Sequence, residues 1–387
     1  RYEPRSNDIE RCPLSREVKD QGMTAVLNPM LGPSPFKVGV FSANADGGLS
    51  MTTVPERWRA GWDDVQRAAV IADEGGIDFF LPIARWRGYG GSTNAREWSF
   101  ETFTFAAALA AVTKRMALFM TVHVPLVHPL YAAKALATVD HISHGRAGLN
   151  IVCGWNPDEF DMFGIKLGEE AYVQAAEWAE ILLKLYTEEK PFDYAGKYYQ
   201  MKGAVSRPTS VQRPRPVTMN AAFGSPGRDF AAKHCDYLFT SFTDLEIGKQ
   251  HVQDIQARGQ AAGRELGVYT IGHVVCRETE KEAQDYYQHF SVDMADHAAV
   301  DYHMAQKKGF SKSHEDAAYL QYRQRFAAGT GSYPLIGTPE QIVSTLVKFH
   351  EAGYAGVALS FVNYANELPF FCERVIPLMK QAGLKVD

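Results

Sequence analysis

Residues 116–152 read MALFMTVHVPLVHPLYAAKALATVDHISHGRAGLNIV, and this stretch decides the fold. Its two ends are short apolar runs of the kind that forms buried strands, and its centre carries the spacing of an amphipathic helix. A strand, a helix long enough to cross back and a second strand form a unit with two parallel strands. We therefore expect strands over 116–122 and 147–152 and a helix over 129–142.

The same alternation continues in both directions along the 387 residues. Further helix patterns cover 58–74, 100–113, 171–186, 244–262 and 339–352. The strand candidates are 37–41, 78–82, 116–122, 147–152, 217–221, 237–240, 268–275 and 356–361. Eight β/α units predict an α/β fold of the TIM (β/α)8 barrel type, in which the chemistry lies at the C-terminal ends of the strands.

Three stretches are additional to the eight β/α units of a minimal barrel. Residues 1–36 form an extension that we expect to wrap the surface or reach a neighbouring subunit, before a single barrel domain over 37–387. Residues 187–216 read as a β-excursion with a proline-rich exit, and 281–332 as a helical insertion. We expect the latter to form a mobile lid over the barrel mouth, with Gly309, Gly329 and Gly331 as hinges. A rigid helical hairpin on the barrel side is the alternative.

Composition excludes several classes of function. Apolar residues make up 46% and charged residues 22%, as in globular proteins. The net charge of −5 is spread without long runs of one sign, so we expect no nucleic-acid partner. Lys114 and Arg115 interrupt the best apolar run, and no signal-peptide core is visible, so we expect a cytoplasmic protein without a membrane segment.

The cysteines predict neither a disulfide framework nor a zinc site, because they are widely spaced and lack a CxxC pattern. They are Cys12, Cys153, Cys235, Cys276 and Cys372. His141 and His144 are three residues apart, but they fall at the end of a predicted helix, where histidines favour the helix dipole. We expect no bound metal.

The segment from Asp140, DHISHGRAGLNIVCGWNPDEFDMFG, resembles a signature of the bacterial-luciferase-like flavin-dependent monooxygenases. Other marks of that family follow in order: Tyr172 fourteen positions ahead of Tyr186, then AGKYY, QRPRP, FGSPGRD, LIGTPEQI and FCERVIPLM. The resemblance covers about residues 37–380. Within the family, RWRGYGG at 85–91 is most similar to the branch of the pyrimidine-ring-opening and dimethylsulfone monooxygenases.

The resemblance implies an enzyme that takes reduced FMN and O2 and inserts one oxygen atom into a small organic substrate. No GxGxxG fingerprint follows a strand, so we expect a separate NAD(P)H-dependent flavin reductase to supply the reduced flavin. The resemblance also implies a homodimer or homotetramer. Candidate substrates are sulfones or sulfonates, N-heterocycles and halogenated aromatics. Aromatic residues in the predicted lid favour an apolar or heteroaromatic molecule, namely Tyr286, Tyr287, Phe290, Tyr302 and Phe310.

Asn150 and Trp155 are the first candidates for the flavin ring. Gly145 and Arg146 make the turn into the strand that carries Asn150, and the CGW tip follows at the barrel mouth. A planar isoalloxazine needs an amide at its edge and flat apolar surface against its face, and these two side chains supply both. In the alternative, Asn150 bonds a loop backbone and Trp155 is core.

For the phosphate, the loop with Gly224 and Ser225 offers free N–H groups before a helix. Ser225 is also expected to cap that helix. In the family a tyrosine preceded by arginine commonly contributes to the phosphate site, whereas here Ala171 precedes Tyr172. The missing cation leaves Tyr172, the Ser225 loop or another basic residue such as Arg228 to hold the phosphate.

Four further positions face the expected reaction centre. Thr121 and His123 end the third strand beside the flavin edge that meets oxygen, where a histidine can donate a proton or orient substrate. A purely structural histidine is the alternative. Ala84 and Arg85 follow the second strand, where Arg85 lies near the ring or pairs on the surface. We name Thr121, His123 and Asn150 as catalytic.

Glu159 is the last of the expected cofactor-binding residues, because the resemblance places it in the flavin site. Its alternative is an exposed carboxylate at the start of a helix. Three other functions stay open from the sequence: a deazaflavin-dependent oxidoreductase on the same fold, a flavin-free hydrolase or lyase barrel, and a flavin-binding protein without turnover.

Overall fold

The computed structural model describes residues 28–166, 168, 170–306 and 317–386. Eight parallel strands close into a ring in the order β1-β2-β3-β4-β7-β8-β9-β11, and β11 pairs with β1. The ring confirms the predicted TIM barrel. Its strands are β1 (Lys37–Phe41), β2 (Phe79–Leu81), β3 (Ala117–His123), β4 (Ala147–Val152), β7 (Val217–Ala221), β8 (Tyr237–Phe239), β9 (Gly267–Cys276) and β11 (Gly356–Ser360).

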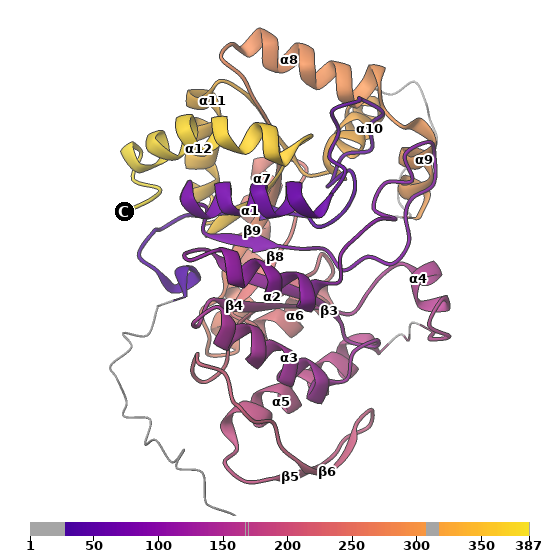
Figure 1. Cartoon of the computed structure of the whole chain (residues 1–387), viewed down its shortest axis with the longest axis vertical. Coiled ribbons are helices and arrows are strands. Elements are labelled where there is room, and N and C mark those ends of the chain that lie inside the picture. Colours follow the sequence, from indigo (N-terminus) through magenta and orange to yellow (C-terminus); the bar gives the residue numbers. More distant parts are fainter. Residues whose placement is uncertain (1–27, 167, 169, 307–316, 387) are drawn as a thin grey trace, which may run out of the picture.

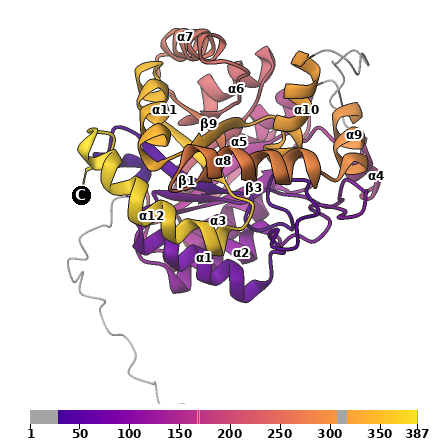
Figure 2. The same ribbon diagram turned by 90° about the horizontal axis from the view of Figure 1, so that it is seen from above.

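Helices surround the strands, as Figure 2 shows from above. The six predicted helices are present with ends shifted by at most four residues: α1 (Trp62–Glu74), α2 (Thr102–Val112), α3 (Pro129–Ile142), α5 (Ala171–Thr187), α7 (Leu245–Ala261) and α11 (Pro339–Glu351). The others are α4 (Pro157–Asp161), α6 (Ser225–His234), α8 (Glu280–Gln288), α9 (His297–Gln306), α10 (Ala317–Gly329) and α12 (Tyr364–Gln381). None of the described helices is long and apolar enough to cross a membrane.

Both predicted insertions have the expected secondary structure. Residues 187–216 contain the antiparallel hairpin of β5 (Phe192–Ala195) and β6 (Gln200–Ala204), which lies at the opposite end of the molecule from α8 (Figure 1). The segment 281–332 is helical in α8, the π-helical turn His289–Asp293, α9 and α10. The expected hinge Gly309 and the aromatic Phe310 lie outside the described residues.

One strand was not predicted. Residues Tyr333–Gly337 form β10, which pairs in parallel with the C-terminal half of β9 beyond the part of β9 that closes the barrel. Pro334 lies inside this short run, and a proline argues against a strand because it donates no ladder hydrogen bond. The strand survives because it lies at the edge of the sheet.

Four aromatic rings fill the middle of the barrel, and each lies beside a glycine on the neighbouring strand. In register, the pairs are Phe79 with Gly39, Phe119 with Gly148, Tyr237 with Gly267, and Tyr269 with Gly356. A Cβ atom added at these glycines would lie only 2.2, 2.7, 2.8 and 2.6 Å from the ring concerned. The rings also contact one another edge to face. We call these four rings the aromatic layer.

Strand periodicity places the next layer directly above. Side chains two residues apart on a strand face the same way, so the positions after the aromatic layer also point into the barrel. Those that line the large cavity described below are Phe41, Thr121, Asn150, Phe239 and Ile271. The aromatic layer therefore supports the floor of that cavity.

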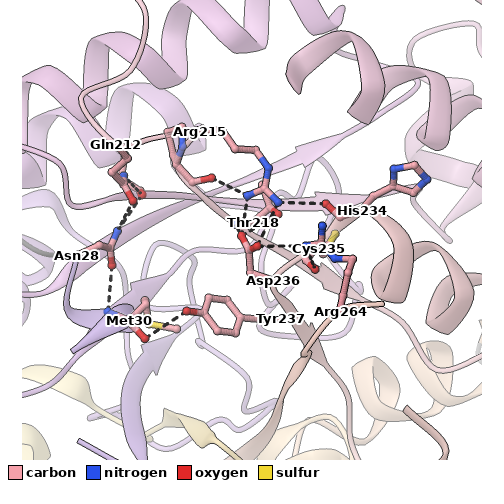
Figure 3. A network of polar contacts seen from close by, with 12 residues as sticks. Asn28, Met30, Gln212, Arg215, Thr218, His234, Cys235, Asp236, Tyr237 and Arg264 are labelled. Atoms are coloured by element: carbon pink, nitrogen blue, oxygen red, sulfur yellow. Dashed lines mark hydrogen bonds and ion pairs between the residues drawn. The ribbon is translucent and has the colours of Figure 1, made fainter. Parts of the chain in front are cut away.

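Polar contacts close the opposite end of the barrel (Figure 3). The carboxylate of Asp236, just before β8, pairs with Arg215 at 2.6 Å and Arg264 at 3.3 Å and accepts from the Thr218 backbone at 2.8 Å. Asn28 donates to the Ala147 carbonyl at 3.1 Å, and Met30 packs inside the barrel beneath the aromatic layer. Residues 28–36 thus cover the barrel base, whereas residues 1–27 of the predicted extension lie outside the described residues.

The aromatic layer generates a stability prediction. Gly39→Ala should lower the free energy of unfolding by about 1–3 kcal/mol, because the new methyl group overlaps the Phe79 ring and overpacked cores cost about that much. Urea unfolding followed by circular dichroism measures the change.

Gly61→Ala is the matched control, since the nearest atom to its new Cβ would be 3.8 Å away. Adding Phe79→Leu to Gly39→Ala should recover part of the loss. If Gly39→Ala is as stable as Gly61→Ala, the close approach of ring and glycine is not a constraint on this fold.

Candidate functional site

A cavity of about 820 Å³ lies above the C-terminal ends of the barrel strands, where the sequence placed the chemistry. This volume lies within the range of about 300–1,000 Å³ that small-molecule and cofactor sites occupy. Its floor comes from the strands, and its upper wall comes from α9 and α10. Of the predicted lid segment 281–332, α9 and α10 thus lie over the barrel mouth, whereas no residue of α8 lines the cavity, and the mobility of the segment stays a prediction.

Thr121 and Asn150 lie side by side on the floor, because β3 and β4 pair these two positions in register. The Thr121 hydroxyl donates to the Pro82 carbonyl at 2.5 Å and accepts from the Asn150 amide nitrogen at 3.2 Å. The Asn150 amide oxygen is buried and has no hydrogen-bond partner among the described residues. Asn150 therefore does not bond a loop backbone, and the alternative reading of this residue is wrong.

His123 lies one layer further out on β3 and also lines the cavity. Its side chain is buried and contacts the Phe160 ring edge to face at 5.5 Å. Burial, with a smaller contribution from the charge of Arg85, lowers the pKa of His123 to about 3. The ring is therefore neutral near pH 7, with one N–H to donate and one nitrogen to accept.

Arg85 and Glu159 form a buried ion pair at the edge of the cavity. The guanidinium lies 3.1 Å from the Glu159 carboxylate, whose side chain is only 2% exposed. That carboxylate also accepts from the backbone of Trp86 at 2.8 Å and of Arg87 at 3.3 Å. Glu159 is thus not an exposed helix-start carboxylate, and that alternative is wrong.

Of these groups, Ala84 and Arg85 line the cavity, whereas Glu159 does not. Glu159 lies behind Arg85 and fixes the loop after β2. A direct contact between Glu159 and a flavin stays a prediction. Arg85 itself is buried and paired, so the alternative of a surface ion pair is wrong for this residue.

Trp155 lies at the cavity mouth and is 40% exposed, which rules out the alternative that it is core. Its ring stacks on His303 of α9 at 5.6 Å, and the Arg85 guanidinium lies 5.2 Å from its centre. The nearby thiol of Cys153 also lines the cavity. Burial raises the pKa of that thiol to about 12, so it is not a thiolate nucleophile at neutral pH.

Gly224 and Tyr172 lie together at the other end of the cavity, at the N-terminus of α6. A Cβ added at Gly227 would lie 2.4 Å from the Tyr172 hydroxyl oxygen, so a glycine is required for the tyrosine to approach the first turn of this helix. Burial raises the pKa of Tyr172, which keeps its phenol protonated and able to donate. Gly224 and Tyr172, which the sequence predicted to lie at one site, thus line the same cavity.

Ser225 differs from its predicted role. The capping position of α6 is Gly224, without a side-chain cap, and Ser225 is the first helical residue. Its hydroxyl accepts from Arg258 of α7 at 3.0 Å and is not part of the cavity lining. Arg228, the suggested substitute for the missing arginine, pairs with Asp254 at 2.8 Å. Arg258, which the sequence did not single out, also reaches this helix end, and it pairs with Asp254 at 3.0 Å and with Asp229 at 2.5 Å.

The family of the chain follows from its sequence as a whole. The model of the luciferase-like monooxygenases matches residues 36–356, which is most of the chain and contains seven of the eight strands of the ring and the first residue of β11. The chain belongs to the luciferase-like monooxygenase family. This result confirms the resemblance found from the motifs.

Two relatives of this luciferase-like monooxygenase come from the branch expected. The pyrimidine monooxygenase RutA of Methylobacterium radiotolerans is 30% identical over 364 residues, which cover 90% of this chain and 93% of that protein. The FMNH2-dependent dimethylsulfone monooxygenase of Pseudomonas putida is 27% identical over 359 residues, which cover 90% and 96%.

Solved structures support the fold. Long-chain alkane monooxygenase (LadA) superposes with a TM-score of 0.81 at 22% identity, covering 92% of this chain and 94% of that one. DmoA from Hyphomicrobium sulfonivorans superposes with a TM-score of 0.79 at 19% identity, covering 91% and 90%.

Several cavity residues of the luciferase-like monooxygenase were missed from the sequence. Of the predicted lid aromatics, Tyr286, Tyr287 and Phe290 pack in a core cluster beside the barrel, and Tyr302 donates to Asp158 at 2.6 Å. The upper wall comes instead from His303, Tyr322 and Phe326. Arg96, Tyr89 and His251 are further cavity residues that were missed. They lie in loops or on helix faces, where strand-end reasoning gives no signal.

The depressed pKa of His123 generates a pH prediction. A group whose folded pKa of about 3 lies below the unfolded value of about 6.5 binds protons more readily in the unfolded chain. Its contribution to stability is therefore complete above about pH 6.5 and is lost as the pH falls toward 3. His123→Asn should reduce the slope of unfolding free energy against pH between pH 6 and 4 by up to about 1.4 kcal/mol per pH unit.

Urea unfolding of both proteins across this range measures that slope. His273, whose pKa is also lowered to about 3 by burial, remains in the variant and should preserve a residual slope. An identical slope with and without His123 would show that this ring is not buried neutral.

Proposed function

We propose that this luciferase-like monooxygenase binds reduced FMN in the 820 Å³ cavity and inserts one oxygen atom of O2 into a small organic substrate. The observation that carries the proposal is the buried amide oxygen of Asn150 on the cavity floor, which has no hydrogen-bond partner in the described part of the chain. Reduced FMN supplies the electrons that activate O2. The relatives named for FMNH2 and for monooxygenation support this chemistry.

Asn150 fits the edge of an isoalloxazine ring because its amide is oriented before any ligand binds. Its nitrogen donates to Thr121, and Thr121 in turn donates to the Pro82 carbonyl, so the amide cannot turn over without losing a bond. The amide oxygen is left to accept from a ring N–H. Since an unpaired buried acceptor costs about 1–3 kcal/mol, a donor at this position is favourable.

The phosphate is proposed to lie at the N-terminus of α6. Free backbone N–H groups and the helix dipole favour an anion there, and the protonated Tyr172 hydroxyl can donate to it. Arg258 binds the Ser225 hydroxyl at this helix end, but it also pairs with Asp229 and Asp254, so the proposed phosphate site relies on the helix N-terminus and Tyr172. In this proposal Gly224 and Tyr172 keep their predicted cofactor-binding roles, whereas Ser225 offers its backbone N–H rather than its hydroxyl, which accepts from Arg258.

The reaction centre is proposed to lie between His123, Arg85 and the Trp155 ring. Neutral His123 can donate a hydrogen bond or a proton from its ring N–H to a group that becomes negative during the reaction. Arg85, paired with Glu159, places a guanidinium beside this centre, and Glu159 with Ala84 shapes the loop that carries it. Aromatic walls keep this part of the cavity poor in water, which protects a reactive centre from side reactions.

The reduced flavin must be supplied, so the proposal includes a separate NAD(P)H-dependent flavin reductase as partner. Anaerobic titration with reduced FMN, with NADH in a parallel titration, tests the proposal: FMN should bind far more tightly. Mixing the loaded protein with O2 should then change the rate of flavin oxidation relative to free flavin. Tight NADH binding without FMN binding would end the proposal.

Asn150→Ala should weaken reduced-FMN binding about tenfold while the thermal midpoint stays near that of the wild type, since removing a cavity-facing amide leaves no core void. Asn220→Ala is the matched control. Asn220 is also a buried strand asparagine, but it bonds the Ile151 carbonyl and does not line the cavity. Equal FMN affinity in both variants would make Asn150 a structural residue only.

A homodimer is proposed to form through α2 and α3. The sequence of α2, TFTFAAALAAV, has threonine as its only polar side chain, and such a helix is normally buried on all sides. In the single chain, Val112 is exposed at its end, and Tyr131 on the neighbouring α3 is 63% exposed. Both helices lie on the outside of the barrel (Figure 1).

Light scattering at micromolar concentration should give twice the chain mass of 43.0 kDa, or four times if two dimers pair. Ala111→Asp on α2 should shift the population to monomer, because a carboxylate would be buried in the interface. Ala257→Asp makes the same change on the exposed side of α7 and should leave the mass unchanged. A monomeric wild type contradicts the dimer.

A further inference from the structure

The cavity has an unbalanced charge. Among the described residues that line it, Arg85 and Arg96 carry positive charge, and none is an aspartate, a glutamate or a lysine. Arg85 is balanced by the Glu159 carboxylate behind it. Arg96 forms no ion pair with any described residue, so its charge is not neutralised by the protein described.

Arg96 is nevertheless firmly placed. It is 2% exposed, and its guanidinium donates to the Gly48 carbonyl at 2.8 Å, the Leu49 carbonyl at 2.7 Å and the Thr330 hydroxyl at 2.5 Å. Neutral acceptors bond the Nε and Nη2 atoms without cancelling the charge of the guanidinium. Burial of such a charge lowers the pKa of Arg96 and is costly unless an anion compensates it.

The backbone around this guanidinium is strained. Arg96 has a φ of 70° and Thr330, which its side chain bonds, has a φ of 57°. Residues with side chains rarely adopt this left-handed conformation, and such strain concentrates at functional sites. Both strained residues belong to one hydrogen bond, from Arg96 to Thr330, which joins the loop after β2 to the end of α10.

Flat apolar surface adjoins the charge. The Arg96 guanidinium lies 4.9 Å from the centre of the Tyr89 ring, and Tyr89 stacks on His303 at 3.9 Å with 13° between the planes. Phe326 of α10 contacts His303 at 4.7 Å, and Tyr322 lies next to Phe326 at 5.6 Å. A molecule beside Arg96 would therefore meet several aromatic rings and a second guanidinium, since Arg85 lies 5.3 Å from the centre of the same Tyr89 ring.

We propose that Arg96 is the anion-binding residue of the substrate half of the cavity, and that the substrate carries a carboxylate, sulfonate or similar oxyanion on a planar apolar body. The inference rests on the proposed function, which assigns the other half to FMN. The phosphate of FMN is proposed to lie at α6, which follows β7, whereas Arg96 lies in the loop after β2. In the ring, β3 and β4 separate β7 from β2. The anion beside Arg96 is thus distinct from the flavin phosphate.

Paired probes of equal shape test this assignment. Benzoate and benzenesulfonate are compared with benzamide and benzenesulfonamide by calorimetry, with and without saturating FMN, in buffer free of phosphate and sulfate. The wild-type chain should bind each anion at least tenfold more tightly than its neutral counterpart, because a charge-assisted hydrogen bond to a buried guanidinium is strong. Equal or weaker binding of the anions would overturn the inference without any variant.

Variants then assign the effect to one side chain. Arg96→Gln should abolish the preference for anions, Arg96→Lys should retain part of it, and FMN affinity should change little in either. Arg67→Gln, at an exposed position on α1, is the control and should behave as the wild type. If the preference survives in folded Arg96→Gln, another group binds the anion and the inference is wrong.

The FMN arm separates this inference from the proposed function. Selective anion binding by a wild-type chain that does not bind FMN would refute the flavin proposal and support the anion subsite. Conversely, loss of FMN affinity in Arg96→Gln with an unchanged preference for benzoate would place the guanidinium at the flavin and overturn the inference. If Arg96→Gln does not fold, the wild-type comparison of charged and neutral probes still decides.

Discussion

The packing of four aromatic rings against four glycines is the constraint on which the rest of the structure depends. Each glycine lies in register with its ring on the next strand, so the two positions must be occupied together. The four rings fit inside the eight strands only because the position paired with each ring is a glycine, which has no side chain. Barrel closure, strand register and the height of the cavity floor all follow from this arrangement.

The residues of the cavity floor lie directly above the aromatic layer. Moving two residues along β3 and β4 leads from Phe119 and Gly148 to Thr121 and Asn150, so the site inherits the register that the rings enforce. The rim is then assembled from segments distant in the chain. The five-residue helix α4 joins two of them, since Glu159 fixes the loop with Arg85 and Asp158 binds Tyr302 of α9.

The sequence predicted the parts of this molecule that follow from local pattern. Strands with clear apolar runs were placed to within about two residues, whereas β10 was missed because Pro334 interrupts a short run. Thr121, His123 and Asn150 were expected at the barrel mouth because strand ends converge there, and all three line the cavity. Arg96 and Arg258 were not expected, because they reach the cavity region through tertiary contacts of a loop and a helix that no periodicity encodes.

The filled barrel also restricts molecular traffic. Within the described part of the chain, the aromatic layer fills the barrel below the cavity and polar contacts close its base, so under the proposed function flavin, substrate and oxygen share the C-terminal rim as their route. A large ligand that reaches the floor first can be followed by a small one, whereas the reverse order is obstructed. The architecture thereby favours an ordered sequence of entry, with the smallest reactant arriving last.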